Sequence, residues 1–464
     1  TRVAERMLFY GGYQIITAMD PEIQYIIEDY LEDEKSEFLK NSEVLNHEAS
    51  FIVIDPFTGH VKGLVGGRGE KTASRILNRA TSTTRSPGSS MKPIASYALA
   101  LDKGIINYGS VLDDTPITIT GKSSFWPRNS NNRFGGLTTI EYALAYSKNT
   151  FPAKLVSTLG VDNVYKFLTE TLGISTLSSR DKVLSALALG GTTYGVTLKD
   201  MTTAYGIFPS GGVYTESSTV VKILDSEGNT VIDNKPRQTV AIKEETAQSM
   251  VRLMKSVINY GTANGYTKKL SKLRLEFAGK TGTTDNNYDK WFVGFTPYYV
   301  GAVWFGFDTP SSLSEAGISS NPAVTAWKLV FEKISESQSY ETLDKPASVE
   351  KADICVISGK LAGSTCEKAT AYYVPGTKPT QKCTNHFDAE ETIDGDEHDV
   401  VEEEDEEDGK ATQKPTSSAS PKPTAAATQK PTPAPQTVVT PPPQPVQPPA
   451  QQNPPPQTGE IGTE

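Results

Sequence analysis

The sequence contains few cysteines and no long apolar run. Cys355, Cys366 and Cys383 are the three cysteines among 464 residues. They are too few for a disulfide-dense scaffold, and their spacing is not that of a CxxC zinc motif. No stretch approaches the roughly 18 consecutive apolar residues of a membrane span, which excludes a transmembrane segment within these residues. Because the chain begins with Thr1-Arg2-Val3 and shows no signal-peptide pattern, we expect it to be part of a longer precursor.

An excess of basic residues is also absent. The net charge of −10 arises from a local block, since residues 388–408 hold 14 acidic side chains and no Lys or Arg. Without this block and the residues after it, the chain carries a net charge of about +2. Such a near-neutral body offers no basic face, so we expect no nucleic-acid partner.

The end of the chain has the composition of a disordered segment. Residues 402–408 form an unbroken acidic run, and 15 of the 56 residues from 409 onward are Pro. Like-charge repulsion and Pro-fixed extended backbone leave little to bury against the entropy of ordering. We interpret 391–464 as a disordered tail, acidic and then Pro-rich. It serves as a solvated spacer or, alternatively, as a docking motif.

The residues before this tail show patterns of both strands and helices. Apolar and β-branched runs predict strands at 13–18, 51–54, 61–65, 275–277, 289–295 and 298–305. Apolar residues at helical spacing predict helices from Asp20-Pro21 onward and at 91–102, 139–146, 150–159, 197–208 and 244–258. Strands at both ends with a helical block between them predict an α+β fold. In it, distant parts of the chain form an antiparallel β-sheet flanked by helices, with a mainly helical subdomain.

Ser89-Ser90-Met91-Lys92 is the first candidate for chemistry. Pro93 and the apolar stripe after it place Ser89 at a helix N-terminus, where free N–H groups favour developing negative charge. Lys92 lies three residues later and thus on the same face, so a desolvated amine can take the proton of the serine hydroxyl. The same S-x-x-K spacing occurs at Ser179 and Ser348, and taken alone each match is more typical of an N-cap or a surface. The residues that flank Ser89 favour it over the other two.

Ser147-Lys148-Asn149 is the second candidate. A capping box at Thr138 and Glu141 starts a helix that ends at this triplet, where a hydroxyl and an amide are also ordinary caps. S-x-N recurs at Ser130 and Ser319, so the triplet has little weight by itself.

Lys280-Thr281-Gly282-Thr283 is the third candidate and occurs once. It falls between strand-like segments, and Asp285-Asn286-Asn287 supplies a turn after it. Gly282 in a strand indicates a bulge or the close approach of another backbone, and a plain hairpin edge is the structural alternative.

The ordered set S-x-x-K, S-x-N, K-T-G resembles the penicillin-recognising serine acyltransferases. The flanking residues, from about 11 to 335, resemble class A, bifunctional penicillin-binding proteins. The segments that carry this resemblance are Gly11–Pro21, Ile54–Gly59, Asn78–Ala80, Arg85–Pro93, Ala188–Gly191, Gly195–Thr197 and Trp291–Pro297.

The resemblance implies a domain order. It assigns 1–50 to an interdomain linker region, 51–335 to a penicillin-binding transpeptidase domain with a serine β-lactamase/transpeptidase-like fold, and 336–390 to a small Cys-containing extension. The family also has an N-terminal membrane anchor and a glycosyltransferase domain, so we expect this chain to correspond to the transpeptidase half of such a protein with its C-terminal extension. The resemblance implies a location on the outer face of the cytoplasmic membrane. The partners that it implies are peptidoglycan stem peptides, lipid II-derived glycan strands, β-lactams and the cell-wall synthesis machinery.

The resemblance also implies a serine DD-transpeptidase mechanism without metal or cofactor. Catalytic roles would fall to Ser89 as nucleophile, Lys92 as base, Ser147 as proton relay and Lys280 as its electrostatic partner. Substrate-binding roles would fall to Asn149, Thr281, Gly282 and Thr283, and the N–H groups of Ser89 and Thr283 would form the oxyanion hole. Trp126 is a candidate for either the substrate groove or the core.

Other activities remain open at this point. A DD-carboxypeptidase or a serine β-lactamase would use the same nucleophile, although no Glu-x-x-Leu-Asn stretch for rapid deacylation is evident. A catalytically dead wall-binding scaffold is the alternative of another class, against which the three complete motifs argue. In an oxidising environment we expect a disulfide between Cys355 and Cys366, leaving Cys383 as a thiol.

Overall fold

The computed structural model describes residues 2–31, 47–117, 125–267, 275–344 and 349–384. All of them fall within one structural unit, Thr1–Asp394. The expected tail, 391–464, lies outside the described residues, so its predicted disorder stays a prediction.

A five-stranded antiparallel sheet forms the centre of this unit, with the order β12-β13-β14-β2-β3. The strands are β2 (Glu48–Ile54), β3 (Val61–Val65), β12 (Ala278–Thr283), β13 (Asp289–Phe295) and β14 (Val300–Gly306). Ile54 pairs with Val300, so the two ends of the domain meet in the middle of the sheet. The expectation of an antiparallel sheet closed by distant segments is thus confirmed. β12 begins at Ala278, so the expected strand at 275–277 is wrong and the K-T-G motif itself is strand.

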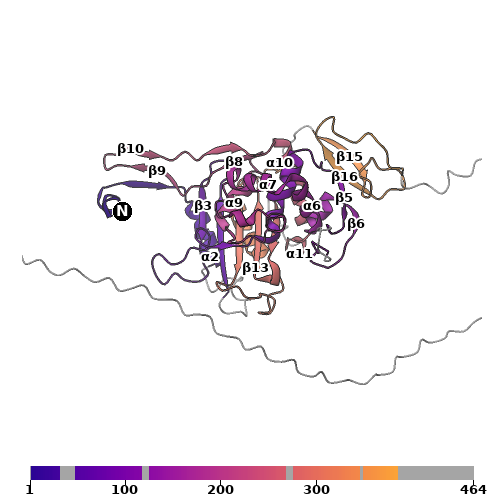
Figure 1. Ribbon diagram of the computed structural model, residues 1–464. Helices are drawn as coiled ribbons and strands as arrows, with labels where there is room; N and C mark the ends of the chain where they lie inside the picture. Colours follow the sequence, from indigo (N-terminus) through magenta and orange to yellow (C-terminus); the bar gives the residue numbers. More distant parts are fainter. Residues whose placement is uncertain (1, 32–46, 118–124, 268–274, 345–348, 385–464) are drawn as a thin grey trace, which may run out of the picture. The chain divides into compact units, whose positions relative to one another are not determined.

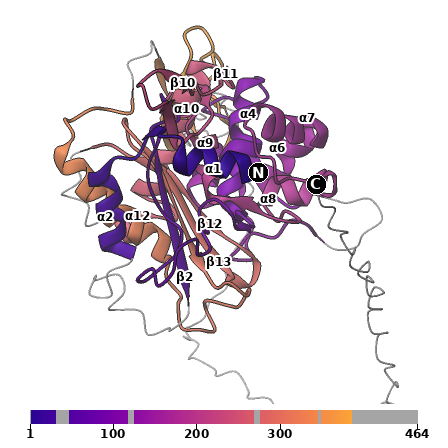
Figure 2. The same ribbon diagram turned by 90° about the vertical axis from the view of Figure 1, so that its left-hand side faces the viewer.

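Helices cover both faces of this sheet, and the side chains of β2, β13 and β14 are therefore buried on both sides. On one face α2 (Pro21–Leu31) and α12 (Pro322–Ile334) pack against the strands and each other. On the other face lie α9 (Leu198–Tyr205) and α10 (Glu244–Asn259) with the rest of the helical block (Figure 2). The predicted α+β class is therefore confirmed.

The helical block lies between β3 and β12 in the sequence and contains the S-x-x-K and S-x-N motifs. Its remaining elements are η1 (Gly88–Met91), η2 (Pro93–Tyr97), α4 (Ala98–Asp102), α5 (Ile140–Ala145), α6 (Thr150–Leu159), α7 (Val161–Lys166), η3 (Phe167–Thr171), η4 (Ser179–Asp181), α8 (Leu184–Leu189) and α11 (Asn264–Thr267). The expected helix at 91–102 is divided into 3₁₀, π and α turns, in part because Pro93 has no N–H to donate.

Short strands outside the central sheet pair with one another in small sheets (Figure 1). They pair as β1 (Gln14–Thr17) with β9 (Val220–Leu224), β9 with β10 (Thr230–Asp233), β4 (Thr84–Arg85) with β7 (Val196–Thr197), β5 (Val111–Asp114) with β6 (Gly136–Thr139), and β8 (Val213–Thr215) with β11 (Gln238–Val240). The other elements are α1 (Arg2–Tyr10), η5 (Asp285–Asn287), η6 (Ser335–Ser337), β15 (Glu350–Cys355) and β16 (Lys368–Tyr373).

Two of the expected ranges contain structure that joins the central domain. The range 1–50 includes α2, whose Ile23, Ile27 and Leu31 are buried in the main core. In the C-terminal extension, the hairpin of β15 and β16 buries Ile354 and Tyr373 in the same core. Among the described residues, no helix has the length and apolarity to cross a membrane.

Candidate active site

Ser89 lies in the 3₁₀ turn η1, at the start of the helical segment that carries Lys92. Gly88 precedes it with φ of 51°, and a Cβ on Gly88 would lie 2.5 Å from the Thr283 carbonyl oxygen. Only glycine allows this combination of left-handed backbone and close approach. The first motif is thereby held directly against the third.

Lys92 is fully buried, and its Nζ makes its hydrogen bonds with the second motif. It donates to the Ser147 carbonyl oxygen at 2.7 Å, to Ser147 Oγ at 3.2 Å and to Asn149 Oδ1 at 2.6 Å. Within the described residues no hydrogen bond links Nζ to Ser89 Oγ. Burial lowers the pKa of Lys92 well below its usual value, and the nearby Lys280 ammonium lowers it further. A neutral amine, the form a base requires, is thus favoured.

Ser147 sits in the turn between α5 and α6 with φ of 55°, which is unusual for a serine. The following residue secures this turn, because Lys148 Nζ forms an ion pair of 2.8 Å with the fully buried Asp114. Asn129, Thr150 and the Gly135 N–H also donate to that carboxylate. Lys148 therefore points away from the motif, into a buried hydrogen-bond network.

Lys280 approaches Ser147 from the sheet. Its Nζ donates to Ser147 Oγ at 2.9 Å and to the Thr281 carbonyl oxygen at 3.0 Å. The side chain is fully buried, and burial lowers the pKa of Lys280 to about 7. The Ser147 hydroxyl thus contacts both buried lysines.

Gly282 lies where β12 crosses η1. A Cβ at this position would lie 2.6 Å from the Pro87 carbonyl oxygen and 2.7 Å from Trp291 Cβ. This is the close approach of another backbone that a glycine in a strand indicated.

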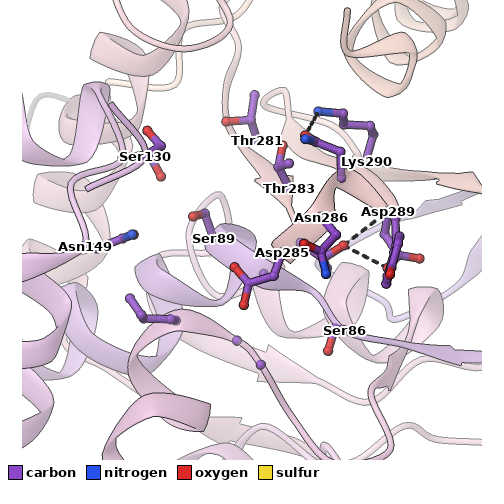
Figure 3. A pocket seen from close by; sticks show the side chains of 18 of the residues that line it. Ser86, Ser89, Ser130, Asn149, Thr281, Thr283, Asp285, Asn286, Asp289 and Lys290 are labelled. Atoms are coloured by element: carbon purple, nitrogen blue, oxygen red, sulfur yellow. Dashed lines mark hydrogen bonds between the residues drawn. The ribbon is translucent and has the colours of Figure 1, made fainter. Parts of the chain in front are cut away.

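The three motifs meet at a cleft of about 1100 Å³. Ser89 faces it, with Asn149 toward one side and Thr281 and Thr283 toward the other (Figure 3). Ser147 and Trp126 also line the cleft, and Trp126 packs partly against the core as well. Lys92 and Lys280 do not line the cleft. They lie beneath its surface and donate hydrogen bonds to the lining residues Ser147 and Asn149.

Several lining residues were not singled out from the sequence. Thr262 Oγ1 lies 2.7 Å from Thr281 Oγ1, and the Arg128 carbonyl oxygen accepts a 2.7 Å hydrogen bond from Asn149 Nδ2. Neither belongs to a recognisable motif, and only the tertiary fold brings them to the cleft. Of the other S-x-x-K serines, Ser179 lies in η4 and is not among the lining residues, whereas Ser348 is outside the described residues.

The cysteines differ from the expected arrangement. Cys355, Cys366 and Cys383 are all thiols, and their Sγ atoms lie within 4.8 Å of one another. The expected Cys355–Cys366 disulfide is therefore wrong for this structure. The turn at Ser358-Gly359-Lys360 does bring Cys355 and Cys366 together, but the segment after β16 also returns and adds Cys383 to them.

Comparison with known proteins agrees with this geometry. Residues 49–326 match the family model described as the penicillin binding protein transpeptidase domain. The chain belongs to the penicillin-binding protein transpeptidase family. Residues 345–388 match a second model, the C-terminal domain of penicillin-binding protein 1A.

Relatives and solved structures within this family extend over most of the chain. Penicillin-binding protein 1A of Clostridium tetani is 31% identical over 82% of this chain and 51% of its own length. That of Neisseria lactamica is 36% identical over 60% of this chain and 35% of its own length. The chain thus spans about half the length, or less, of these curated relatives.

Two solved structures relate the fold to penicillin-binding proteins. Penicillin-binding protein 1A of Haemophilus influenzae superposes with a TM-score of 0.62 at 25% identity, covering 73% of this chain and 55% of that one. The PonA1 protein of Mycobacterium tuberculosis in complex with penicillin V gives a TM-score of 0.61 at 26% identity, covering 74% and 91%.

Proposed function

We propose that this chain is a serine-type D-Ala-D-Ala transpeptidase that cross-links peptidoglycan stem peptides through an acyl-enzyme on Ser89. The observation that carries this proposal is the placement of the Ser147 hydroxyl between two buried amines, beside a cleft that Ser89 faces. A wall-binding scaffold would have no use for two desolvated lysines, because burying them costs stability.

In the acylation step, Ser89 Oγ attacks the carbonyl carbon of the penultimate D-Ala, and its proton passes to neutral Lys92. The resulting oxyanion accepts hydrogen bonds from the N–H groups of Ser89 and Thr283. The C–N bond then breaks, the Ser147 hydroxyl protonates the departing amine, and protonated Lys92 replaces the proton on Ser147. The contact of 3.2 Å between Lys92 Nζ and Ser147 Oγ supports this relay.

In the second step, an amine of a neighbouring strand attacks the Ser89 ester. That amine gives a proton to the relay, and Ser89 Oγ leaves with a proton, which regenerates the hydroxyl. Lys280 stabilises negative charge on Ser147 Oγ, from which it lies 2.9 Å. Since both steps use the same two amines, the loss of either one affects the whole cycle.

Substrate binding falls to the residues on either side of Ser89. One N–H of the Asn149 side-chain amide donates to the Arg128 carbonyl oxygen, and the other N–H would donate to the substrate amide. Thr281 and Thr283 would bind the terminal carboxylate, Gly282 leaves room for β12 to lie against η1, and Trp126 would contact the stem peptide. β-Lactams would bind in the same place and acylate Ser89.

The wider context is also proposed from the family. The chain would be the transpeptidase part, 51–335, of a bifunctional peptidoglycan synthase, with an extension at 336–390. It would act on lipid II-derived glycan strands at the outer face of the cytoplasmic membrane, together with the cell-wall synthesis machinery. The glycosyltransferase activity of such a synthase would belong to a domain other than 51–335.

Intact-mass spectrometry after mixing with benzylpenicillin tests the nucleophile. We expect one stable adduct per chain, mapped to the peptide that contains Ser89. Ser89→Ala should abolish the adduct, whereas Ser179→Ala, in the other described S-x-x-K sequence, should leave it unchanged. A β-lactamase would return unmodified protein and hydrolysed drug, and a scaffold would gain no mass.

A second assay separates transfer to an amine from transfer to water. The chain is given a D-Ala-D-Ala-ended peptide and an excess of an amine acceptor, and the products are resolved by chromatography. An amide product supports the transpeptidase. Exclusive hydrolysis with a competent acceptor present would reassign the chain as a carboxypeptidase.

A further inference from the structure

The C-terminal extension gathers three thiols at one point. The Sγ atoms of Cys355, Cys366 and Cys383 lie within 4.8 Å of one another, and all three residues are buried, with exposures of 0%, 8% and 8%. They form a cluster separate from the main core. A disulfide joins only two sulfurs, so a bridge would leave one thiol of this cluster unused.

Backbone hydrogen bonds bring the three thiols together from separate segments. Cys355 ends β15, and its N–H donates to the Lys360 carbonyl oxygen at 2.9 Å, which closes a tight turn. The next residue, Leu361, accepts a 2.8 Å hydrogen bond from the Cys383 N–H. Gly363 then donates its N–H to Cys366 Sγ at 3.3 Å. Such an N–H···S contact suits a sulfur that carries negative charge.

Little apolar packing supports the segments around the thiols, which are held mainly by backbone hydrogen bonds. The hairpin of β15 and β16 places Ile354, Ala371 and Tyr373 in the main core. The chain at 356–367 and 374–384 contains no helix or strand beyond isolated β-bridges of Leu361 with Ile354 and Lys382. The partly buried hydrophobic residues that pack against the thiols, among the described residues, are Ile357 and Ala362. Where a hydrophobic core is this small, disulfides or metal ions commonly add the missing stability.

The arrangement fits the coordination of zinc. Zinc binds thiolates at about 2.3 Å in a tetrahedral geometry, which sets neighbouring sulfurs about 3.8 Å apart. Sulfurs already within 4.8 Å reach this spacing with small side-chain movements. Soft thiolate ligands favour zinc over the hard cations magnesium and calcium.

We propose that Cys355, Cys366 and Cys383 bind one Zn²⁺ ion through their three Sγ atoms, as a structural site of the extension. The thiols lose their protons to solvent on binding, and three thiolates with one divalent ion carry a net charge of −1. Lys360 and Lys382 stand next to the site, one at the turn that Cys355 closes and one directly before Cys383. Their charges offset that of the bound cluster.

The CxxC spacing criterion could not detect such a site, because the ligands come from three segments that only the fold unites. A tetrahedral site has a fourth position. In the sequence, His386 follows Cys383 at Cys-x-x-His spacing, but it lies outside the described residues. The proposal therefore concerns the three thiols only and does not depend on acyl transfer at Ser89.

Metal analysis of the full chain, purified under reducing conditions without chelator, tests the site. We expect about one zinc per chain by plasma mass spectrometry. Cobalt added to the chelator-treated chain should give thiolate-to-cobalt charge-transfer bands. Cys366→Ser and Cys383→Ser should weaken zinc binding at least tenfold, whereas Thr370→Ala, on β16 of the same hairpin, should bind as the parent does. Cys383→His, which keeps a zinc ligand, should restore much of the binding.

Two further measurements keep the result clear if a variant folds poorly. Benzylpenicillin acylation should persist in the cysteine variants, which shows that the catalytic domain is folded. Hydrogen exchange at 349–384 should accelerate when zinc is removed from the parent chain. Absence of zinc and of charge-transfer bands in the reduced chain would overturn the proposal. So would a native disulfide between two of the cysteines, or unchanged metal content in both serine variants.

Discussion

The Ser147 hydroxyl oxygen lies 3.2 Å from Lys92 Nζ and 2.9 Å from Lys280 Nζ. Two amines buried beside one hydroxyl disfavour simultaneous protonation, since each ammonium raises the cost of charging the other. The two amines therefore titrate as a coupled pair, and a change in one of them alters the protonation of the other.

Ser147→Ala should slow acylation by benzylpenicillin about 10²–10⁴-fold, because it removes the proton relay and the hydroxyl that both lysines contact. Stopped-flow or mass-spectrometric acylation rates give the measurement. Ser157→Ala, at an exposed position of α6, is the matched control and should react normally. A rate within twofold of the parent would remove Ser147 from the mechanism.

The curve of acylation rate against pH should have an ascending limb and a descending limb. It should rise as Lys92, whose pKa is lowered, loses its proton and becomes a base. It should fall as pH passes through about 7, the lowered pKa of Lys280, because the cation beside Ser147 is lost. Lys280→Arg keeps a positive charge at all these pH values, so its descending limb should move to higher pH. An unchanged descending limb would assign that ionisation to another group.

Lys280→Met should raise the free energy of unfolding near neutral pH by about 1–4 kcal/mol while abolishing acylation, because it removes a desolvated charge from the core. Burial lowers the folded-state pKa of Lys280 from 10.5 to about 7, so between these values the unfolded chain binds more protons. The stability of the parent therefore rises with pH across this window, and the advantage of the variant should shrink toward its upper end. Urea titrations at several pH values would show whether the gain is instead independent of pH.

Asp114→Asn should destabilise the domain by about 3 kcal/mol and slow acylation, because Lys148 would be left buried without its counter-ion and the turn at Ser147 would lose its anchor. Burial alone would raise the pKa of Asp114, but hydrogen bonds from Lys148, Thr150, Asn129 and the Gly135 N–H outweigh it and hold the pKa below its usual value.

The stabilisation by Asp114 is therefore present above its unfolded-state pKa and is lost as pH falls through the folded-state pKa. Between pH 7 and pH 3, the melting temperature of Asp114→Asn should fall by less than that of the parent. The neighbouring Asp113 is exposed, so Asp113→Asn should keep the behaviour of the parent. Equal melting curves for the two variants would contradict the assigned role.

Gly282→Ala should cost about 1–3 kcal/mol of stability, because its Cβ would lie within 3 Å of both the Pro87 carbonyl oxygen and Trp291. By pushing β12 away from η1 it should also reduce the acylation rate. Gly265→Ala, in α11, meets no neighbouring atom within 4 Å and serves as the control. Calorimetry and acylation assays on the two variants together check whether the contact matters.

The fold class and the family could be predicted because both depend on local sequence. The runs at β2 and β14 and the helical stripe of α10 are periodic, and the three motifs keep their order along the chain. The limits of individual elements were harder to predict. β12 starts later than its apolar run suggests because pairing with β13 decides its extent, and Phe277 lies before that ladder begins.

The hydrogen-bond partners within the site could not be obtained from spacing. The S-x-x-K pattern placed Lys92 on the face of Ser89, but its amine donates to Ser147 and Asn149, which arrive from another helix junction. Thr262 and the cysteine cluster were missed for the same reason. Each depends on a tertiary contact between segments that no local pattern connects.

The central sheet has a consequence for biosynthesis. β2 pairs with β14 through Ile54 and Val300, which are about 250 residues apart in the sequence. Pairings between such distant segments are slow to form during folding. At translation rates of 5–20 residues per second, β2 waits on the order of 10–50 seconds for its partner strand. During that interval its apolar side chains and unpaired backbone edge can pair with other chains. Refolding of this protein should therefore be slow, and its yield should fall as the protein concentration rises.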